Sequence, residues 1–76
     1  MNQMKRNILR KARSMLENAS ELVIQVRDDE QDSFDNLPEG IQESERGQKM
    51  EEAIDAMDSA MDSISEAIEH LEEASQ

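Results

Sequence analysis

Residues 50–74 read MEEAIDAMDSAMDSISEAIEHLEEA, and the spacing of the apolar residues in this stretch decides the fold class. The large apolar side chains recur at alternating steps of four and three residues, which places them along one side of a helix. This row consists of Met50, Ile54, Met57, Met61, Ile64, Ile68 and Leu71. Beside it, at seven-residue intervals, stand Ala53, Ala60, Ala67 and Ala74. From this spacing we expect a helix over about 45–75. Because the alanine row lets a second helix approach closely, we expect the large row beside it to form an oligomer interface.

A second amphipathic pattern lies upstream and predicts a helix over about 3–31. Its apolar row follows the same spacing and consists of Ile8, Ala12, Met15, Ala19, Leu22 and Val26. A flanking row, one residue further along, widens the apolar side with Leu9, Leu16 and Val23. This breadth is typical of a helix in a bundle, because a simple two-stranded coiled coil needs only a narrow seam.

The segment 32–44, DSFDNLPEGIQES, predicts an acidic turn between the helices. Pro38 disfavours helix at Leu37, Gly40 tolerates a positive φ, and Ser44 is a suitable N-cap for the second helix. The loop end of the core is expected to be covered by Phe34, Leu37 and Ile41. The predicted fold is therefore all-α: one domain, 1–76, forming an antiparallel two-helix hairpin that dimerises into a four-helix bundle.

The composition excludes several function classes. The 76 residues include 19 acidic and 8 basic side chains, for a net charge of -11, which opposes binding to nucleic acid. There is no Cys, Trp or Tyr, so disulfide scaffolds, thiolate zinc sites and aromatic base-stacking platforms are not available. No apolar run approaches the roughly 20 residues of a membrane span. We expect a cytoplasmic protein that binds neither membrane nor cofactor.

The charges are unevenly distributed. The first thirteen residues carry five bases and no acid, namely Lys5, Arg6, Arg10, Lys11 and Arg13. An antiparallel hairpin would place them beside the acidic end of the second helix, at Glu66, Glu69, Glu72 and Glu73. Alternatively, Arg6, Arg10 and Arg13 of several chains could converge into a pocket for an anionic nucleotide.

Metal and catalytic sites are weakly indicated. Several calcium-ligand spacings of a helix-loop-helix site are matched by Asp28, Glu30, Asp32, Asn36 and Glu39, but Ser33 stands where that loop needs glycine. His70 and Glu66 share a helical face, and two ligands rarely make a metal site. A solvated acidic turn and a surface histidine are the favoured interpretations. With no nucleophile–base arrangement and no glycine-rich phosphate loop, we expect neither a metal site nor an enzyme.

Three motifs carry a resemblance to a known group of proteins. They are Asn36-Leu37-Pro38-Glu39-Gly40, Ser44-Glu45-Arg46-Gly47 and Met50-Glu51-Glu52-Ala53-Ile54-Asp55. In these motifs the chain resembles small acidic helical-hairpin proteins encoded by phages and prophages of Gram-positive bacteria. The resemblance implies a mobile-element setting in the cytoplasm of a bacterial host, where tiny acidic proteins often look like inhibitors of host machinery.

The functional expectation is a non-enzymatic protein-binding module. Its acidic residues would occupy a basic surface of a host protein that normally holds nucleic acid. The expected contact residues are Asp55, Asp62, Glu66, Glu69 and Glu73 on the second helix, with Asp28 and Asp32 on the first. The alternatives are an oligomeric sponge for an anionic nucleotide signal and a purely structural assembly protein.

Overall fold

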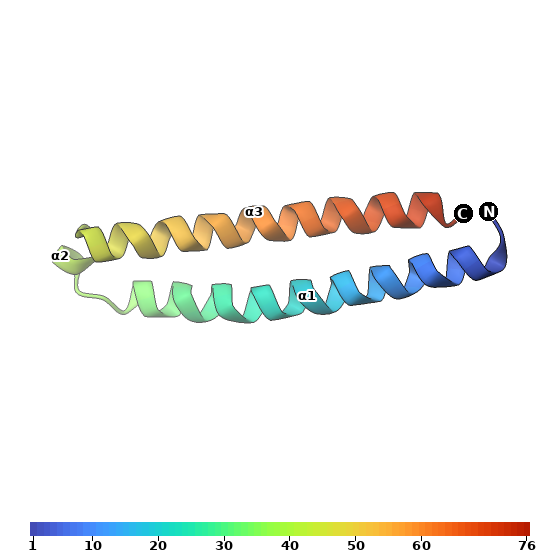
Figure 1. Ribbon diagram of the computed structural model, residues 1–76. Helices are drawn as coiled ribbons and strands as arrows, with labels where there is room; N and C mark the ends of the chain where they lie inside the picture. The colour runs from blue at the N-terminus through green and yellow to red at the C-terminus, as the bar shows by residue number, and fades with distance from the viewer.

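The computed structural model describes all residues 1–76 and contains three helices (Figure 1). They are α1 (Gln3–Asp35), α2 (Glu39–Gln42) and α3 (Glu45–Ala74). The chain contains no strand, so the all-α prediction is confirmed. The molecule is a rod whose principal extents are 58 × 15 × 12 Å.

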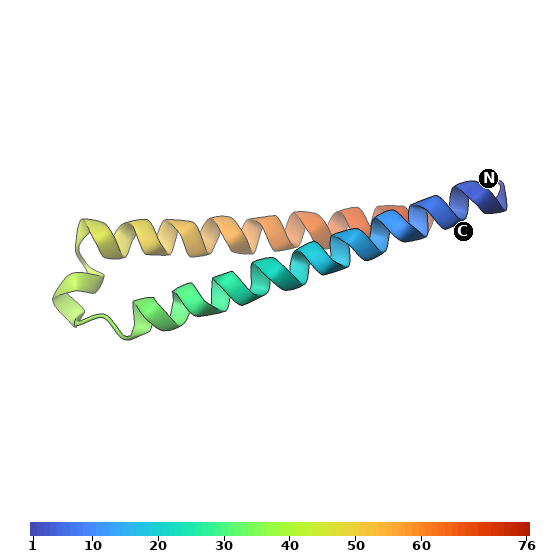
Figure 2. The same cartoon turned by 60° about the horizontal axis from the view of Figure 1, so that its bottom comes forward.

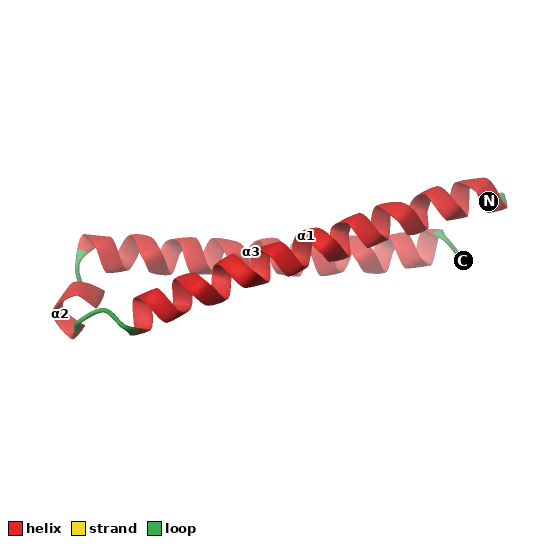
Figure 3. Ribbon diagram, turned by 90° about the horizontal axis from the view of Figure 1, so that it is seen from below, coloured by secondary structure: helices red, strands yellow, loops and turns green.

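The two long helices lie side by side and run in opposite directions, with both termini at one end (Figure 1). They cross at an angle, as packed helices do (Figures 2 and 3). Arg13 pairs with Glu72 at 3.3 Å and Arg27 with Asp58 at 2.9 Å. The same number of residues separates the members of these pairs on each helix, so one register holds between them. By that register α3, which ends at Ala74, ends level with Lys11, and the first turns of α1 extend past it.

Helix α1 continues one turn beyond the predicted end near residue 31. It begins at the N-cap Asn2, whose side chain accepts a hydrogen bond from the backbone N–H of Lys5 at 2.8 Å. It ends at Asp35, with Asn36 as the C-cap. Nothing before Leu37 breaks the helix, because the restriction imposed by Pro38 acts only on the residue immediately preceding it.

The predicted turn contains the short helix α2, which differs from the irregular segment expected. Gly40 lies inside α2, and no residue of the chain has a positive φ, so the conformational role predicted for this glycine is wrong. The side chain of Gln42 donates a hydrogen bond to the backbone carbonyl of Phe34 at 3.0 Å, which ties α2 to the end of α1. Phe34 and Leu37 are half-buried as expected, whereas Ile41 is exposed.

A close backbone approach joins α2 to α3. Ser44 is the N-cap of α3, as predicted, and its hydroxyl accepts the N–H of Gly47 at 3.4 Å. Gly47 is buried, and a Cβ atom at this position would lie 2.0 Å from the carbonyl oxygen of Gln42. The chain makes this turn because Gly47 has no side chain.

The apolar row of α3 faces α1 of the same chain. Ile54 is 5% exposed and is the one fully buried apolar side chain, while the other members of the row are half-buried. The row predicted as an oligomer interface is therefore engaged within the hairpin.

Helix α1 is rotated relative to the expectation. The residues that turn toward α3 are half-buried and belong to the flanking row: Leu9, Leu16 and Val23, with Ala12 and Ala19. The row predicted as the main contact is left outside, since its large members Ile8, Met15, Leu22 and Val26 are all more than half exposed. On α1 the row of Ile8, Met15 and Leu22 lies on one side of Ala12 and Ala19, and the row of Leu9, Leu16 and Val23 lies on the other. The observed rotation turns the second row toward α3 and brings Arg27 against Asp58.

Candidate interaction surfaces

Two arginine residues connect acidic side chains of both long helices, and we call these contacts the arginine bridges. The guanidinium of Arg27 lies 2.9 Å from Asp58 of α3 and 3.5 Å from Asp28 of α1. That of Arg13 lies 3.3 Å from Glu72 of α3 and 3.4 Å from Glu17 of α1. Both bridges therefore lie on one side of the groove between the helices.

The hydrogen bond to Asp58 also perturbs Arg27. It raises the pKa of the Arg27 guanidinium above its ordinary value, and the charges of Asp58 and Asp28 act in the same direction. Because Arg27 is only 27% exposed at its side chain, its bridge is the better shielded of the two. This bridge holds the middle of α3 to α1 by a charge-assisted contact.

Four of the seven acidic residues predicted to bind a partner lie on the side marked by the arginine bridges. They are Asp28 on α1 and Asp55, Asp62 and Glu69 on α3, where Asp55 and Asp62 flank Asp58 by one turn in each direction. Asp32 lies on the outer side of α1, and Glu66 and Glu73 lie on the outer side of α3, so these three point away from the groove. We call the side of the arginine bridges the acidic face.

Most carboxylates of the acidic face are free of basic partners. Of the seven predicted contact residues, Asp28 alone forms an ion pair. All seven are exposed. The acids of α1 and α3 thus come together only in part, at Asp28, Asp55, Asp62 and Glu69. The contact of Arg13 with Glu72 was predicted from the antiparallel arrangement, whereas that of Arg27 with Asp58 was not, because no local spacing indicates which residue of α3 lies opposite Arg27.

The basic end of α1 pairs less extensively than expected. Among the predicted contacts with Glu66, Glu69, Glu72 and Glu73, only the one from Arg13 to Glu72 forms. The physical reason is the register, which ends α3 level with Lys11 and leaves Lys5, Arg6 and Arg10 beyond it.

The three arginines predicted to bind an anion therefore differ in their surroundings. Arg13 is engaged by two carboxylates, and Arg10 donates a hydrogen bond to the side chain of Asn7 at 3.3 Å. Arg6 has no carboxylate partner, and its Nε is buried without a hydrogen-bond acceptor. Steps of four and three residues keep all three on one side of α1.

The acids considered as calcium ligands lie in different parts of the fold, so they do not surround a common point. Asp28 lies at an arginine bridge, Glu30 lines a pocket on the opposite side, and Glu39 belongs to α2. No group of three or more His, Asp or Glu side chains is arranged to hold a metal ion. His70 is exposed on α3.

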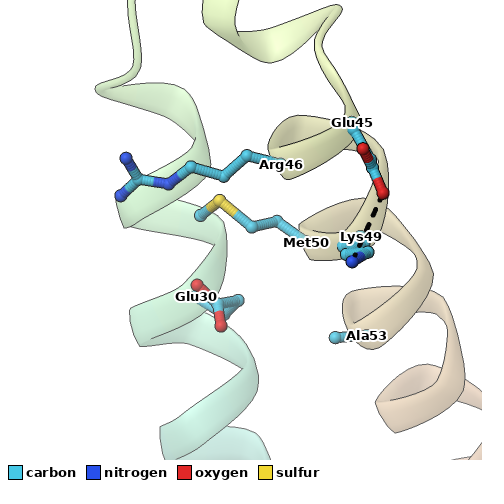
Figure 4. A pocket seen from close by; sticks show the side chains of 6 residues that line it. All are labelled: Glu30, Glu45, Arg46, Lys49, Met50 and Ala53. Atoms are coloured by element: carbon cyan, nitrogen blue, oxygen red, sulfur yellow. Dashed lines mark ion pairs between the residues drawn. The ribbon is translucent and has the colours of Figure 1, made fainter.

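One open pocket lies near the loop end, and its volume is about 560 Å³ (Figure 4). Its walls are formed by Glu30, Glu45, Arg46, Lys49, Met50 and Ala53. Glu45 and Lys49 form an ion pair at 3.5 Å along α3, so part of its charge is neutralised internally. Ala53 in the pocket and Asp58 in an arginine bridge stand on opposite sides of the large apolar row of α3. The pocket therefore lies on the side of the hairpin opposite to the arginine bridges.

None of the helices combines the length and the apolar character needed to cross a membrane. Comparison with known proteins gives no match to a family model, to a curated protein or to a solved structure.

Proposed function

We propose that this chain is a non-enzymatic protein-binding module whose acidic face occupies a basic, nucleic-acid-binding surface of another protein. The observation that supports the proposal most strongly is the row of exposed, unpaired carboxylates Asp55, Asp62 and Glu69 along α3, on the side of the arginine bridges. Such a surface attracts a cationic cleft at long range and makes association sensitive to salt.

The length and charge spacing of the acidic face support this proposal. Along α3 the unpaired carboxylates Asp55, Asp62 and Glu69 recur every seven residues, which corresponds to an axial rise of about 10.5 Å. Phosphates rise by about 3.4 Å along one strand of a DNA duplex. The acidic face therefore offers the same sign of charge in a linear array, at about one third of the density of one strand.

The resemblance to phage and prophage proteins favours a target in the bacterial host, reached in the cytoplasm. We also propose that the working unit is a pair of hairpins in a four-helix bundle. A single hairpin fully buries only one apolar side chain, Ile54, which is little for a stable domain of this size.

The proposal is tested by removing charge from the acidic face. The variant Asp55→Asn/Asp62→Asn/Glu69→Gln keeps the side-chain shapes and removes three unpaired carboxylates. The matched control, Asp29→Asn/Glu39→Gln/Glu43→Gln, removes the same charge from positions off the acidic face of α3. The probe is a DNA-binding protein captured by the wild-type chain from nuclease-treated lysate of a Gram-positive bacterium. Its displacement from labelled DNA is measured over a salt series.

We expect the acidic-face variant to inhibit DNA binding at least about tenfold less well, and the control to change it less than about threefold. Inhibition by wild type should weaken steeply as salt rises. Equal losses in both variants would refute the proposal, because they would show that only net charge matters.

The anionic-ligand alternative is favoured by a separate observation. Lys5, Arg6, Arg10 and Lys11 form no ion pair with a carboxylate, so four positive charges remain available at one end of the rod. Calorimetric titration with a nucleoside triphosphate tests it. Binding that Arg6→Gln/Arg10→Gln abolishes, and that the acidic-face variant preserves, would favour the sponge over the protein-binding module.

A further inference from the structure

The row of α1 that does not contact α3 is a continuous apolar surface. Its large members lie at helical spacing and are strongly exposed: Met4 73%, Ile8 60%, Met15 64%, Leu22 63% and Val26 58%. Exposed apolar residues scattered singly are ordinary, whereas a row along one side of a helix indicates a surface that packs against something.

This row lies on the same side of the hairpin as the alanine row of α3. Glu30 follows Val26 by one helical turn, and Ala53 is the first residue of the alanine row. Glu30 and Ala53 line the same pocket from the two helices (Figure 4). The two rows therefore flank one groove, on the side opposite to the arginine bridges. We call this side the apolar face.

Large and small side chains alternate along the apolar face. The arginine bridges set Glu72 level with Arg13, so Ala67, five residues earlier on α3, lies level with the turn between Met15 and Leu22. By the same register Ala60 lies between the levels of Leu22 and Val26. No carboxylate of either helix points to this side between the levels of Ile8 and Val26, because the acids there lie on the side of the arginine bridges or on the outer side of their helix.

We propose that a second copy of this chain covers the apolar face, with a two-fold axis along the rod and the two loops at the same end. This symmetry places the large row of α1 over the alanine row of the partner's α3, and the reverse, so the face is complementary to itself. Every helix then has antiparallel neighbours, as in an up-down four-helix bundle. The interface between copies is this face and not the large row of α3, which is used within the hairpin.

The size of the apolar face suits this occupant. From Lys11 to Val26 both helices are present, so the face is about 23 Å long and about 20 Å wide, and the turns of α1 from Met4 to Lys11 add about 10 Å at the width of one helix. Each copy therefore covers about 550 Å². The total of about 1,100 Å² exceeds the roughly 1,000 Å² that a specific interface needs. The acidic faces of the two copies then point away from each other, which keeps their charges apart.

The oligomeric state of two matched variants tests the proposal. Leu22→Lys places a charge on the apolar face. Ile24→Lys makes the same change two residues along, at a side chain that is 42% exposed and lies on the side of the arginine bridges. Both positions are exposed in the single hairpin, so far-UV circular dichroism should report helix in both. Mass is measured by light scattering over a concentration series at moderate salt.

We expect wild type and Ile24→Lys at twice 8.7 kDa and Leu22→Lys at 8.7 kDa, with a dissociation constant at least about 100-fold weaker. A monomeric wild type would overturn the proposal and leave the face to a different protein. A dimeric Leu22→Lys would also overturn it, because the copies would then pair through another surface.

The placement of the loops is tested separately by a spin label. The chain has no cysteine, so Gly40→Cys accepts a single label, and a Cβ atom at this position meets nothing within 4 Å. The expected distance between labels in the dimer is about 15–30 Å, set by helix spacings of 8–10 Å. A distance near the 58 Å length of the rod would overturn the proposed arrangement. Neither test depends on the acidic face, so failure of this dimer proposal can be distinguished from failure of the proposed function.

Discussion

Replacing Gly47 by alanine should destabilise this protein, against the expectation from helix propensity. Gly47 lies in the first turn of α3, and alanine in a helix is favoured over glycine by about 1 kcal/mol. In the structure, however, the added Cβ would lie 2.0 Å from the carbonyl oxygen of Gln42 and 2.7 Å from that of Ile41. Both atoms belong to backbone, which cannot rotate away as a side chain does.

The magnitude follows from the displacement that the new atom requires. Restoring ordinary contact means moving the backbone of α2 by more than 1 Å, as an order-of-magnitude estimate, and overpacking of this kind costs about 1–3 kcal/mol. The movement also disturbs the hydrogen bond from Gln42 to Phe34 and the N-cap at Ser44. After subtraction of the helix-propensity gain of about 1 kcal/mol, overpacking leaves a net loss of up to about 2 kcal/mol in the free energy of unfolding, and the disturbed hydrogen bonds add to this loss.

Gly40→Ala is the matched control. This glycine also lies in a helix, and a Cβ atom added there meets nothing within 4 Å. It should leave stability unchanged or raise it by up to about 1 kcal/mol. Urea unfolding followed by circular dichroism, at one protein concentration, compares the two variants with wild type. If Gly47→Ala proves as stable as Gly40→Ala, the close approach between α2 and α3 does not exist as described.

Two further changes probe the core and the cap. Ile54→Ala should lower the free energy of unfolding by about 2–3 kcal/mol. This is the lower part of the range for a buried isoleucine, because one side of the site is near solvent. The control Ile24→Ala, at an exposed position, should change the free energy of unfolding by less than about 0.5 kcal/mol. Thermal unfolding measures both, and equal effects would contradict the assignment of Ile54 to the core. Ser44→Ala should lose about 1 kcal/mol by leaving the N–H of Gly47 without its acceptor. Ser44→Asp should retain most of the stability, and a loss as large as that of alanine would contradict the capping role.

Much of the fold could be predicted because it depends on local chemistry. The period of the apolar residues specifies helices, the restriction that Pro38 imposes on Leu37 ends α1, and the hydroxyl of Ser44 starts α3. Helix α2 was missed because Glu39–Gln42 spans little more than one turn, too short for a periodic pattern to be visible.

The rotation of α1 could not be predicted from the sequence. The rows that contain Met15 and Leu16 are one residue apart and similarly apolar, so periodicity does not choose between them. The choice is associated with contacts between residues distant in the chain, above all Arg27 with Asp58. The same contacts bring Asp28 to the side of Asp55, Asp62 and Glu69, and for this reason the sequence could not show which of the predicted acids share a side.

The hairpin carries its acidic and apolar faces on opposite sides, and this has a consequence for stoichiometry. If two copies join through their apolar faces, the assembly presents two acidic faces directed outward. Each dimer would then engage two target molecules, or two basic sites of one target. A second contact made within an already bound complex benefits from a high effective concentration, so modest affinity at each acidic face becomes strong avidity. If the acidic face inhibits its target as proposed, a multimeric target should therefore be inhibited more potently than its isolated subunit.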